Sequence, residues 1–112
     1  MSFSPDTEKL VDELIQAEYG NACEKFGEKY HSLHEGYAIL LEELEEVKEN
    51  YKKVKLAREM LWEKIKNENC CVYQFDSLIE NIEFYVKEET KELAQVGAVL
   101  LKIRNTINEV KQ

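Results

Sequence analysis

Apolar residues recur along most of the chain at the spacing of three and four residues that is typical of amphipathic helices. The first set follows Ser4-Pro5-Asp6, where a serine that can cap a helix and an early proline indicate a helix start. Its members are Leu10, Val11, Leu14, Ile15, Ala22 and Phe26. We therefore predict a first helix from about Asp6 to the region 27–30, with Gly20 as a weak point inside it.

A second periodic stretch follows Ser32, which is a candidate N-cap with Glu35 as its capping-box partner three residues later. Its apolar positions are Tyr37, Leu40, Leu41, Leu44, Val47, Tyr51, Val54, Met60, Leu61 and Ile65. No glycine or proline occurs after Gly36 until Gly97. The simple prediction is one helix of about 30 residues that ends near Asn67. A break in the lysine-rich middle is the alternative.

A third helical stretch is predicted after a loop over Asn67–Phe75, where poor helix formers gather. Asp76 is its candidate N-cap, and its apolar positions are Ile79, Ile82, Val86, Leu93, Val96, Leu100, Ile103, Ile107 and Val110. From Leu93 onward these positions alternate steps of three and four, as in a coiled-coil seam. Gly97 and Ala98 are small, so another helix can approach closely there.

Three long amphipathic helices without strand-like alternation predict one all-α domain over residues 1–112, folded as a helical bundle. A slender monomer of this kind leaves part of its apolar stripes uncovered. We therefore expect self-association into a homodimer or a homotetramer, because burial against a second copy removes that surface from water.

Composition and charge narrow the classes of partner. The chain is 44% hydrophobic and 34% charged, which is typical of a globular domain, and its net charge of -8 argues against nucleic acid and anionic membranes. Its apolar runs are too short for a transmembrane helix, and its first residues do not resemble a signal peptide. The three cysteines show no paired C-x-x-C spacing and are expected to be reduced thiols. We therefore expect a cytoplasmic protein.

The segment with the most chemical content is the acidic run around Glu42, Glu43 and Glu46. On a helix these three carboxylates fall within an arc of roughly 100°, beside the apolar stripe. Like charges this close repel, and a hard divalent cation such as Mg²⁺ would offset the repulsion because it prefers oxygen ligands. The alternative is a solvated acidic face, since glutamate is a strong helix former.

A second acidic element lies in the third predicted helix. Glu88, Glu92 and Gln95 follow the spacing i, i+4, i+7 and share one helix face. If that face meets Glu43 and Glu46, oxygen atoms from two helices converge, as they do in metal sites of helical bundles.

At these residues the chain resembles a known family. Segments 25–46 and 92–99 are similar to the MazG-like nucleotide pyrophosphohydrolases, in particular to small phage and prophage members. This family belongs to the all-α NTP pyrophosphatase group, together with the dimeric dUTPases. The resemblance extends from about Leu10 to Ile107.

The resemblance implies a Mg²⁺ ion, which Mn²⁺ can replace, held by Glu43, Glu46 and Glu92. Glu42 would be a further ligand or would activate water. The implied reaction hydrolyses a nucleoside triphosphate to a monophosphate and pyrophosphate, in a role that would clear non-standard or excess nucleotides.

The chain departs from the family pattern in two respects. Gln95 stands where the family has aspartate, and 45 residues separate Glu46 from Glu92, a longer gap than the family motif has. The amide of Gln95 keeps one carbonyl oxygen but loses the charge. Glu88 is a candidate replacement for the missing carboxylate.

Two further residues are candidates for substrate contacts. Lys53 lies two turns beyond Glu46 on the same face and could meet a triphosphate, although pairing with nearby glutamates is the simpler interpretation. His34 lies beside the start of the second predicted helix and is either a substrate contact or a surface residue. The competing interpretation of the whole chain is a non-catalytic interaction or oligomerisation protein with a degenerate metal site, which Gln95 favours and the clustered glutamates oppose.

Overall fold

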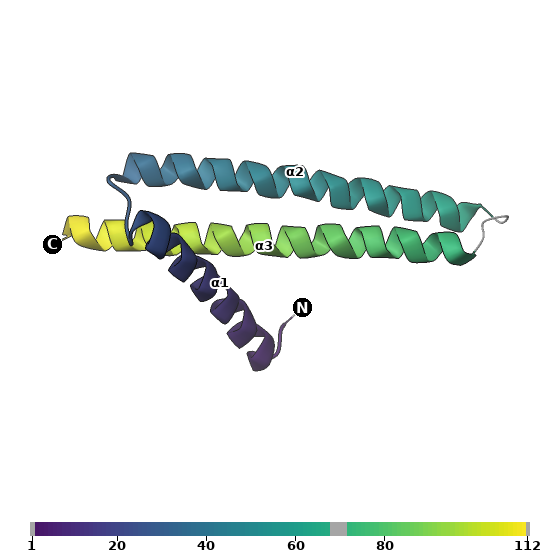
Figure 1. Ribbon diagram of the computed structural model, residues 1–112, viewed down its shortest axis with the longest axis horizontal. Helices are drawn as coiled ribbons and strands as arrows, with labels where there is room; N and C mark the ends of the chain where they lie inside the picture. Colours follow the sequence, from purple (N-terminus) through teal and green to yellow (C-terminus); the bar gives the residue numbers. More distant parts are fainter. Residues whose placement is uncertain (1, 68–71, 112) are drawn as a thin grey trace.

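The protein folds as three helices without any strand among the residues that the structure, a computed structural model, describes, namely 2–67 and 72–111. The helices are α1 (Pro5–Phe26), α2 (Leu33–Lys66) and α3 (Val72–Lys111). Figure 1 shows α2 and α3 lying side by side along the long axis, while α1 crosses α3 and diverges from the pair toward the N-terminus. The all-α prediction is confirmed.

Local capping signals set both ends of α1 and the start of α2. The Ser4 hydroxyl accepts a hydrogen bond from the Thr7 amide at 3.2 Å, and the Ser32 hydroxyl accepts one from the Glu35 amide at 3.1 Å. Gly27 ends α1 with a φ of 86°, a conformation that glycine adopts without the steric penalty of a side chain. Gly20 lies inside α1 without ending it. The prediction of a single second helix is confirmed, because α2 continues unbroken to Lys66.

The predicted start of the third helix is wrong. The expected loop reached Phe75 with Asp76 as N-cap, yet α3 already includes Val72 and the residues that follow it. Helix propensity is a weak preference that packing can override. Here Phe75 is half-buried, and the Lys64 ammonium donates a 3.0 Å hydrogen bond to the Gln74 side chain. Residues 68–71 of the expected loop lie outside the described ranges.

The core lies mainly between α2 and α3 and is built mostly from small residues. Its buried members are Tyr30, Ala57, Leu78, Ala94, Val96, Ala98 and Val99. Gly36 allows the start of α2 to come close to α3 and to the Tyr30 ring, since a Cβ atom placed there would lie 3.0 Å from Ile103 and 3.0 Å from Tyr30. Small side chains at these positions bring the two helix axes near each other, but they contribute little apolar area per residue.

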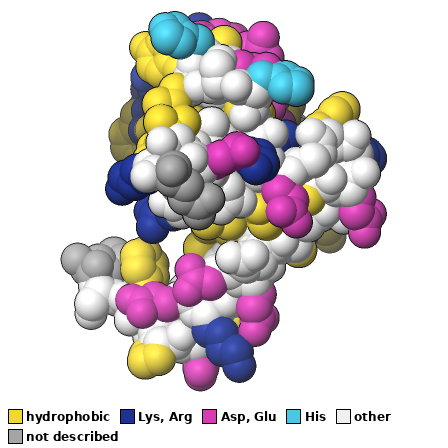
Figure 2. All heavy atoms as spheres, turned by 90° about the vertical axis from the view of Figure 1, so that its left-hand side faces the viewer, with side chains coloured by type: hydrophobic (Ala, Val, Ile, Leu, Met, Phe, Trp, Pro, Cys, Tyr) yellow, Lys and Arg dark blue, Asp and Glu magenta, His cyan; other side chains and the backbone are white. Residues whose placement is uncertain are grey.

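The crossing of α1 and α3 occurs at Gly97. A Cβ atom on Gly97 would lie 2.8 Å from two carbons of the Ile15 side chain, so only glycine permits this approach. The predicted close approach at Gly97 is therefore confirmed. No residue of α1 is buried, and Figure 2 shows the N-terminal part of α1 as a lobe apart from the helix pair.

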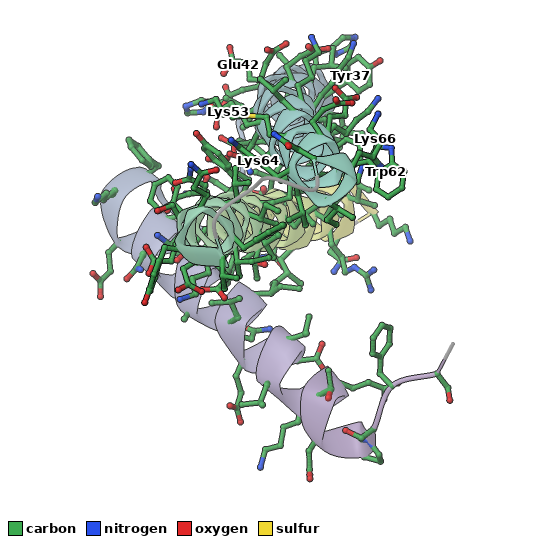
Figure 3. The ribbon with its side chains drawn as sticks, turned by 90° about the vertical axis from the view of Figure 1, so that its right-hand side faces the viewer. Tyr37, Glu42, Lys53, Trp62, Lys64 and Lys66 are labelled. Atoms are coloured by element: carbon green, nitrogen blue, oxygen red, sulfur yellow. The ribbon has the colours of Figure 1, made fainter. Side chains whose placement is uncertain are left out.

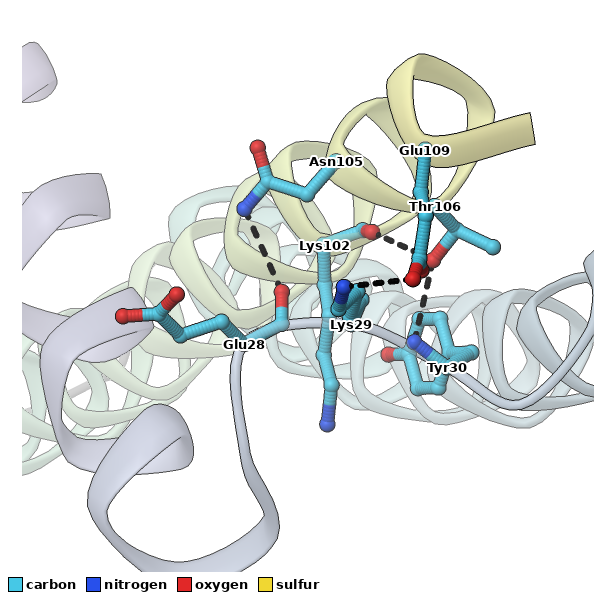
Figure 4. Close-up of polar contacts among 7 residues, drawn as sticks. All are labelled: Glu28, Lys29, Tyr30, Lys102, Asn105, Thr106 and Glu109. Carbon is cyan, nitrogen blue, oxygen red and sulfur yellow. Dashed lines mark hydrogen bonds and ion pairs between the residues drawn. The ribbon is translucent and has the colours of Figure 1, made fainter. Parts of the chain in front are cut away.

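The connection between α1 and α2 is attached to the last turns of α3 (Figure 4). The buried Tyr30 amide donates to the Thr106 hydroxyl at 2.9 Å, and that hydroxyl donates to the Lys102 carbonyl at 2.9 Å. The Asn105 amide also donates to the Glu28 carbonyl at 3.2 Å. These bonds hold the Tyr30 ring against α3, where it forms part of the wall of a cleft between α1 and the helix pair.

The chain is far more extended than a compact domain of its length. Its radius of gyration is 18.6 Å, whereas about 13 Å is typical of 112 residues. Its accessible surface is 8777 Å², against about 6,400 Å² for a compact protein of this mass. Along the predicted coiled-coil seam Val96 is buried, but Leu93 and Leu100 remain about half exposed. Much apolar surface is therefore left open in the single chain.

Two further expectations concern membranes and cysteines. In the described part of the chain, none of the helices combines the length and the hydropathy that crossing a bilayer would require. Cys23 is a half-buried free thiol of α1. Cys70 and Cys71 lie outside the described ranges, and the reduced state of the three thiols stays a prediction.

Candidate functional site

Three glutamates from two helices converge near the middle of the α2–α3 pair. Glu43 and Glu46 are one turn apart on α2, and Glu92 faces them from α3. One carboxylate oxygen of each lies within 4.8 Å of the other two. The structure thus brings together the three residues that the sequence proposed as metal ligands; we refer to them as the glutamate triad.

The triad is partly removed from water because its residues border the apolar stripe of each helix. Glu43 and Glu92 are half-buried, and Glu46 is exposed. Oxygen Oε2 of Glu43 and Oε2 of Glu92 are buried and have no hydrogen-bond partner among the described residues. Buried oxygens without partners are costly, so the triad is destabilising unless a proton or a cation is supplied.

The charges of the triad act on one another. Burial raises the pKa of Glu43, and the neighbouring charges of Glu46 and Glu42 raise it further. Burial is also the first cause of the raised pKa of Glu92, followed by its hydrogen bond with the Glu46 carboxyl and by the triad's charges. Both shifts indicate an environment that favours a positive partner.

A hard divalent cation fits this set of donors. Three carboxylate groups, two of which carry a buried oxygen without a partner in the described structure, match the oxygen ligands that Mg²⁺ and Mn²⁺ prefer. Two oxygens on one Mg²⁺ lie at most about 4.2 Å apart. The separations in the triad, all within 4.8 Å, are close to that limit.

A cleft of about 590 Å³, here cleft A, opens beside the triad between α1, the α1–α2 connection and the helix pair. Glu43 lines it together with Glu42 and Gln95. Glu42 and Gln95 are both exposed and lie outside the triad. The remaining lining residues are Glu18, Asn21, Ala22, Lys25, Phe26, Tyr30, His31, Glu35, Ile39, Ala98, Val99 and Lys102.

A second cleft of about 490 Å³, here cleft B, lies on α2 and α3. It is lined by Glu45, Glu46, Glu49, Asn50, Lys53, Phe84, Tyr85, Glu88 and Glu92. Because Glu43 belongs to cleft A and the other two members to cleft B, the triad lies between the clefts. Figure 3 shows Glu42 and Lys53 on one side of α2, opposite Tyr37 and Trp62.

The remaining candidates are placed less favourably. Glu88 lines cleft B but accepts a 2.7 Å hydrogen bond from Lys91 and is not part of the triad. His34 is exposed and lines neither cleft, whereas His31 lines cleft A. Figure 2 shows the two histidines on the surface at the end of the helix pair where α2 begins.

One lysine of the lysine-rich segment pairs with a glutamate, while the pairing predicted for Lys53 itself stays a prediction. Lys52 donates a 3.0 Å hydrogen bond to Glu49, one turn away, and this bond lowers the pKa of Glu49. Lys53 lines cleft B beside Glu46 and is exposed. It remains available to a ligand in that cleft.

Sequence reasoning missed Glu89. Both of its carboxylate oxygens are buried without a hydrogen-bond partner in the described structure, and burial raises its pKa. The nearby Asn50 amide, which donates to the Tyr85 carbonyl at 2.9 Å, lowers that pKa in part. The signal was present: Glu89 and Glu92 repeat on α3 the spacing of Glu43 and Glu46 on α2.

Comparisons of the chain with models of protein families, with curated proteins and with solved structures found no match. The resemblance to MazG-like proteins therefore stays a prediction from segments 25–46 and 92–99. The function of the chain has to be inferred from the geometry of the triad and of its two clefts.

Proposed function

We propose that the protein is a Mg²⁺-dependent nucleoside triphosphate pyrophosphohydrolase of the MazG-like type. The observation that carries this proposal is the glutamate triad, with one oxygen of each residue within 4.8 Å of the others and two buried oxygens without partners. A solvated acidic face would present exposed carboxylates that water satisfies. The half-buried Glu43 and Glu92 differ from that pattern.

The residues divide into a set that would hold the cation and a set that would act around it. Glu43, Glu46 and Glu92 would bind Mg²⁺, which in such sites neutralises phosphate oxygens and lowers the pKa of a bound water. Glu42 is exposed in cleft A beside the triad and is our candidate to accept the proton of that water. In cleft B, Lys53 is a candidate contact for phosphate oxygens.

Gln95 and Glu88 have smaller roles in this proposal. Gln95 lines cleft A, where its amide can donate to or accept from a ligand without adding charge. Glu88 is paired with Lys91 and lies outside the triad, so it is a weak candidate for a fourth carboxylate. His34, which lines neither cleft, is the least supported of the substrate contacts.

The open apolar surface supports a second element of the proposal, which is self-association. The accessible surface exceeds that of a compact protein by about 2,400 Å². A standard protein interface buries about 800 Å² on each partner, so a homodimer or a homotetramer could use this surface. The same observation supports the competing function, a non-catalytic helical interaction protein. Velocity sedimentation in dilute solution tests this element, and the mass of a single chain would contradict it.

Pyrophosphate release from a panel of nucleoside triphosphates with Mg²⁺ tests the enzymatic proposal. The native protein should release pyrophosphate from at least one triphosphate, and Glu46→Gln should lower the rate by at least tenfold. Glu59→Gln, at an exposed position of α2 outside both clefts, is the matched control and should keep the native rate. A native protein that is inactive on the whole panel and binds no Mn²⁺ would support the interaction protein instead.

A further inference from the structure

Lys102 is a buried cation that the proposed metal site does not use. The residue is 6% exposed and lines cleft A. The ammonium lies 4.4 Å from the centre of the Tyr30 ring and 5.9 Å from that of Phe26. Within the described residues, no carboxylate forms an ion pair with it.

An ammonium of this kind is costly to bury without an anionic partner. Lysine is almost never fully buried unless it is paired. The two rings compensate in part, because their faces attract cations. They supply no negative charge, however, and leave the ammonium's hydrogen-bonding protons available to a ligand in the cleft.

The surrounding structure holds Lys102 in place. Its carbonyl accepts the hydrogen bond of Thr106, whose oxygen accepts the Tyr30 amide. Figure 4 shows the Lys102 side chain extending from α3 beside the Tyr30 ring. Contacts with α3 and with the α1–α2 connection therefore position the ammonium, unlike that of a flexible lysine on the surface.

The charge balance of cleft A decides which anion can enter. Four carboxylates line the cleft (Glu18, Glu35, Glu42 and Glu43), against the two lysines Lys25 and Lys102. A free anion would be repelled by this excess. A divalent cation at the triad would reverse the local balance next to Glu43, so an anion should bind only together with the metal.

We propose that Lys102 is the anion-binding residue of cleft A, where its ammonium contacts a phosphate oxygen of a phosphoanhydride chain whose metal is held by the glutamate triad. This inference rests on the proposed function and deepens it. It assigns the phosphate contact to cleft A, in addition to the exposed Lys53 of cleft B. Tyr30 and Phe26 hold the ammonium without neutralising it.

The test is calorimetric titration of inorganic tripolyphosphate, with Mg²⁺ present, into native protein, Lys102→Met, Lys102→Arg and Lys87→Met. Methionine keeps most of the apolar stem and removes the charge, arginine keeps the charge, and Lys87 is an exposed lysine of α3 outside both clefts. A charge-assisted hydrogen bond predicts binding at least about tenfold weaker for Lys102→Met. Lys102→Arg and Lys87→Met should stay within about threefold of the native affinity. Without metal, no binding is expected.

A Mn²⁺ titration of the same variants separates ligand binding from a structural role. Removing a positive charge from cleft A, which Glu43 also lines, should leave Mn²⁺ affinity unchanged or slightly higher in Lys102→Met. If Mn²⁺ affinity and melting temperature fall together with tripolyphosphate affinity, Lys102 is structural and the inference is overturned. Native tripolyphosphate affinity in Lys102→Met, or no binding by the native protein, overturns it as well. If the native protein also binds no Mn²⁺, the proposed metal site fails independently.

Discussion

Replacing Glu43 by glutamine should raise the stability of the metal-free protein and remove its response to metal. Glutamine has nearly the same shape and no charge, and Glu43 lies within 4.8 Å of two other carboxylates. At that distance each charged pair repels by about 0.9 kcal/mol in water and about 3.5 kcal/mol at an effective dielectric constant of 20. Because Glu46 is exposed and solvent screens it, the lower end applies. We therefore expect a gain of about 1–2 kcal/mol.

In the presence of metal, Glu43→Gln should be less stable than the native protein. A cation at 100 times its dissociation constant stabilises the native protein by about 2.7 kcal/mol. For a domain of this size that corresponds to a rise in melting temperature of about 10 °C. The variant loses a ligand and should lose most of this rise. Its melting temperature should therefore exceed the native value in EDTA and fall below it in saturating Mn²⁺.

Differential scanning calorimetry of native protein, Glu43→Gln and Glu59→Gln, in EDTA and in Mn²⁺, measures both effects. Glu59 is exposed on the same helix, so its replacement should change stability by less than about 0.5 kcal/mol. The reasoning is refuted if Glu43→Gln melts below the native protein in EDTA while the native melting temperature ignores Mn²⁺.

The protonation of the triad, the side chain at Gln95 and the helix crossing at Gly97 give three further predictions. The raised pKa values of Glu43 and Glu92 mean that the folded state holds these protons more tightly than the unfolded chain, whose carboxyls titrate near the ordinary value of 4.5. The stabilisation from these bound protons is present below pH 4.5 and is lost as the pH rises through the pKa values of the folded state. The metal-free protein should therefore have a higher melting temperature at pH 5 than at pH 8. Mg²⁺ should reduce this difference in melting temperature. Gln95→Asp adds a carboxylate to cleft A beside the triad, so calorimetric Mn²⁺ affinity should rise, and an unchanged affinity would place this residue outside the reach of the ion. Gly97→Ala should lower the melting temperature, because the added Cβ would lie 2.8 Å from a side chain of α1. Gly20→Ala is the control: its Cβ would have no atom within 4 Å, so the free energy of unfolding should rise by about 0.5–1 kcal/mol. Equal changes in the melting temperatures of the two variants would contradict the crossing of α1 and α3.

The start of α3 shows where local signals fail. Asp76 looked like an N-cap because it comes after a stretch of poor helix formers, yet α3 already includes Val72. The additional turn contacts α2 through the hydrogen bond from Lys64 to Gln74. The two partners are separated by ten positions and belong to different helices, so helix propensity alone does not report on them.

The sequence proposed all three members of the triad, but local spacing alone places only Glu43 and Glu46 together, because they are neighbours on one helix turn. The partner from α3 could not be decided so directly, since Glu88, Glu89 and Glu92 all lie within five positions. Which of them meets α2 depends on the register of the two helices. Packing of apolar residues sets that register, and it brings Glu92 into the triad and leaves Glu88 paired with Lys91.

The sequence by itself determined the helical class, the caps at Ser4 and Ser32, and the acidic pair of α2, because each depends on interactions between residues a few positions apart. Only the tertiary structure decided that α1 crosses at Gly97 and that Lys102 lies buried beside Tyr30. Tyr30 and its hydrogen-bond partner Thr106 are 76 positions apart. No periodicity along the chain encodes such a pairing, because it arises from how three separately formed helices pack.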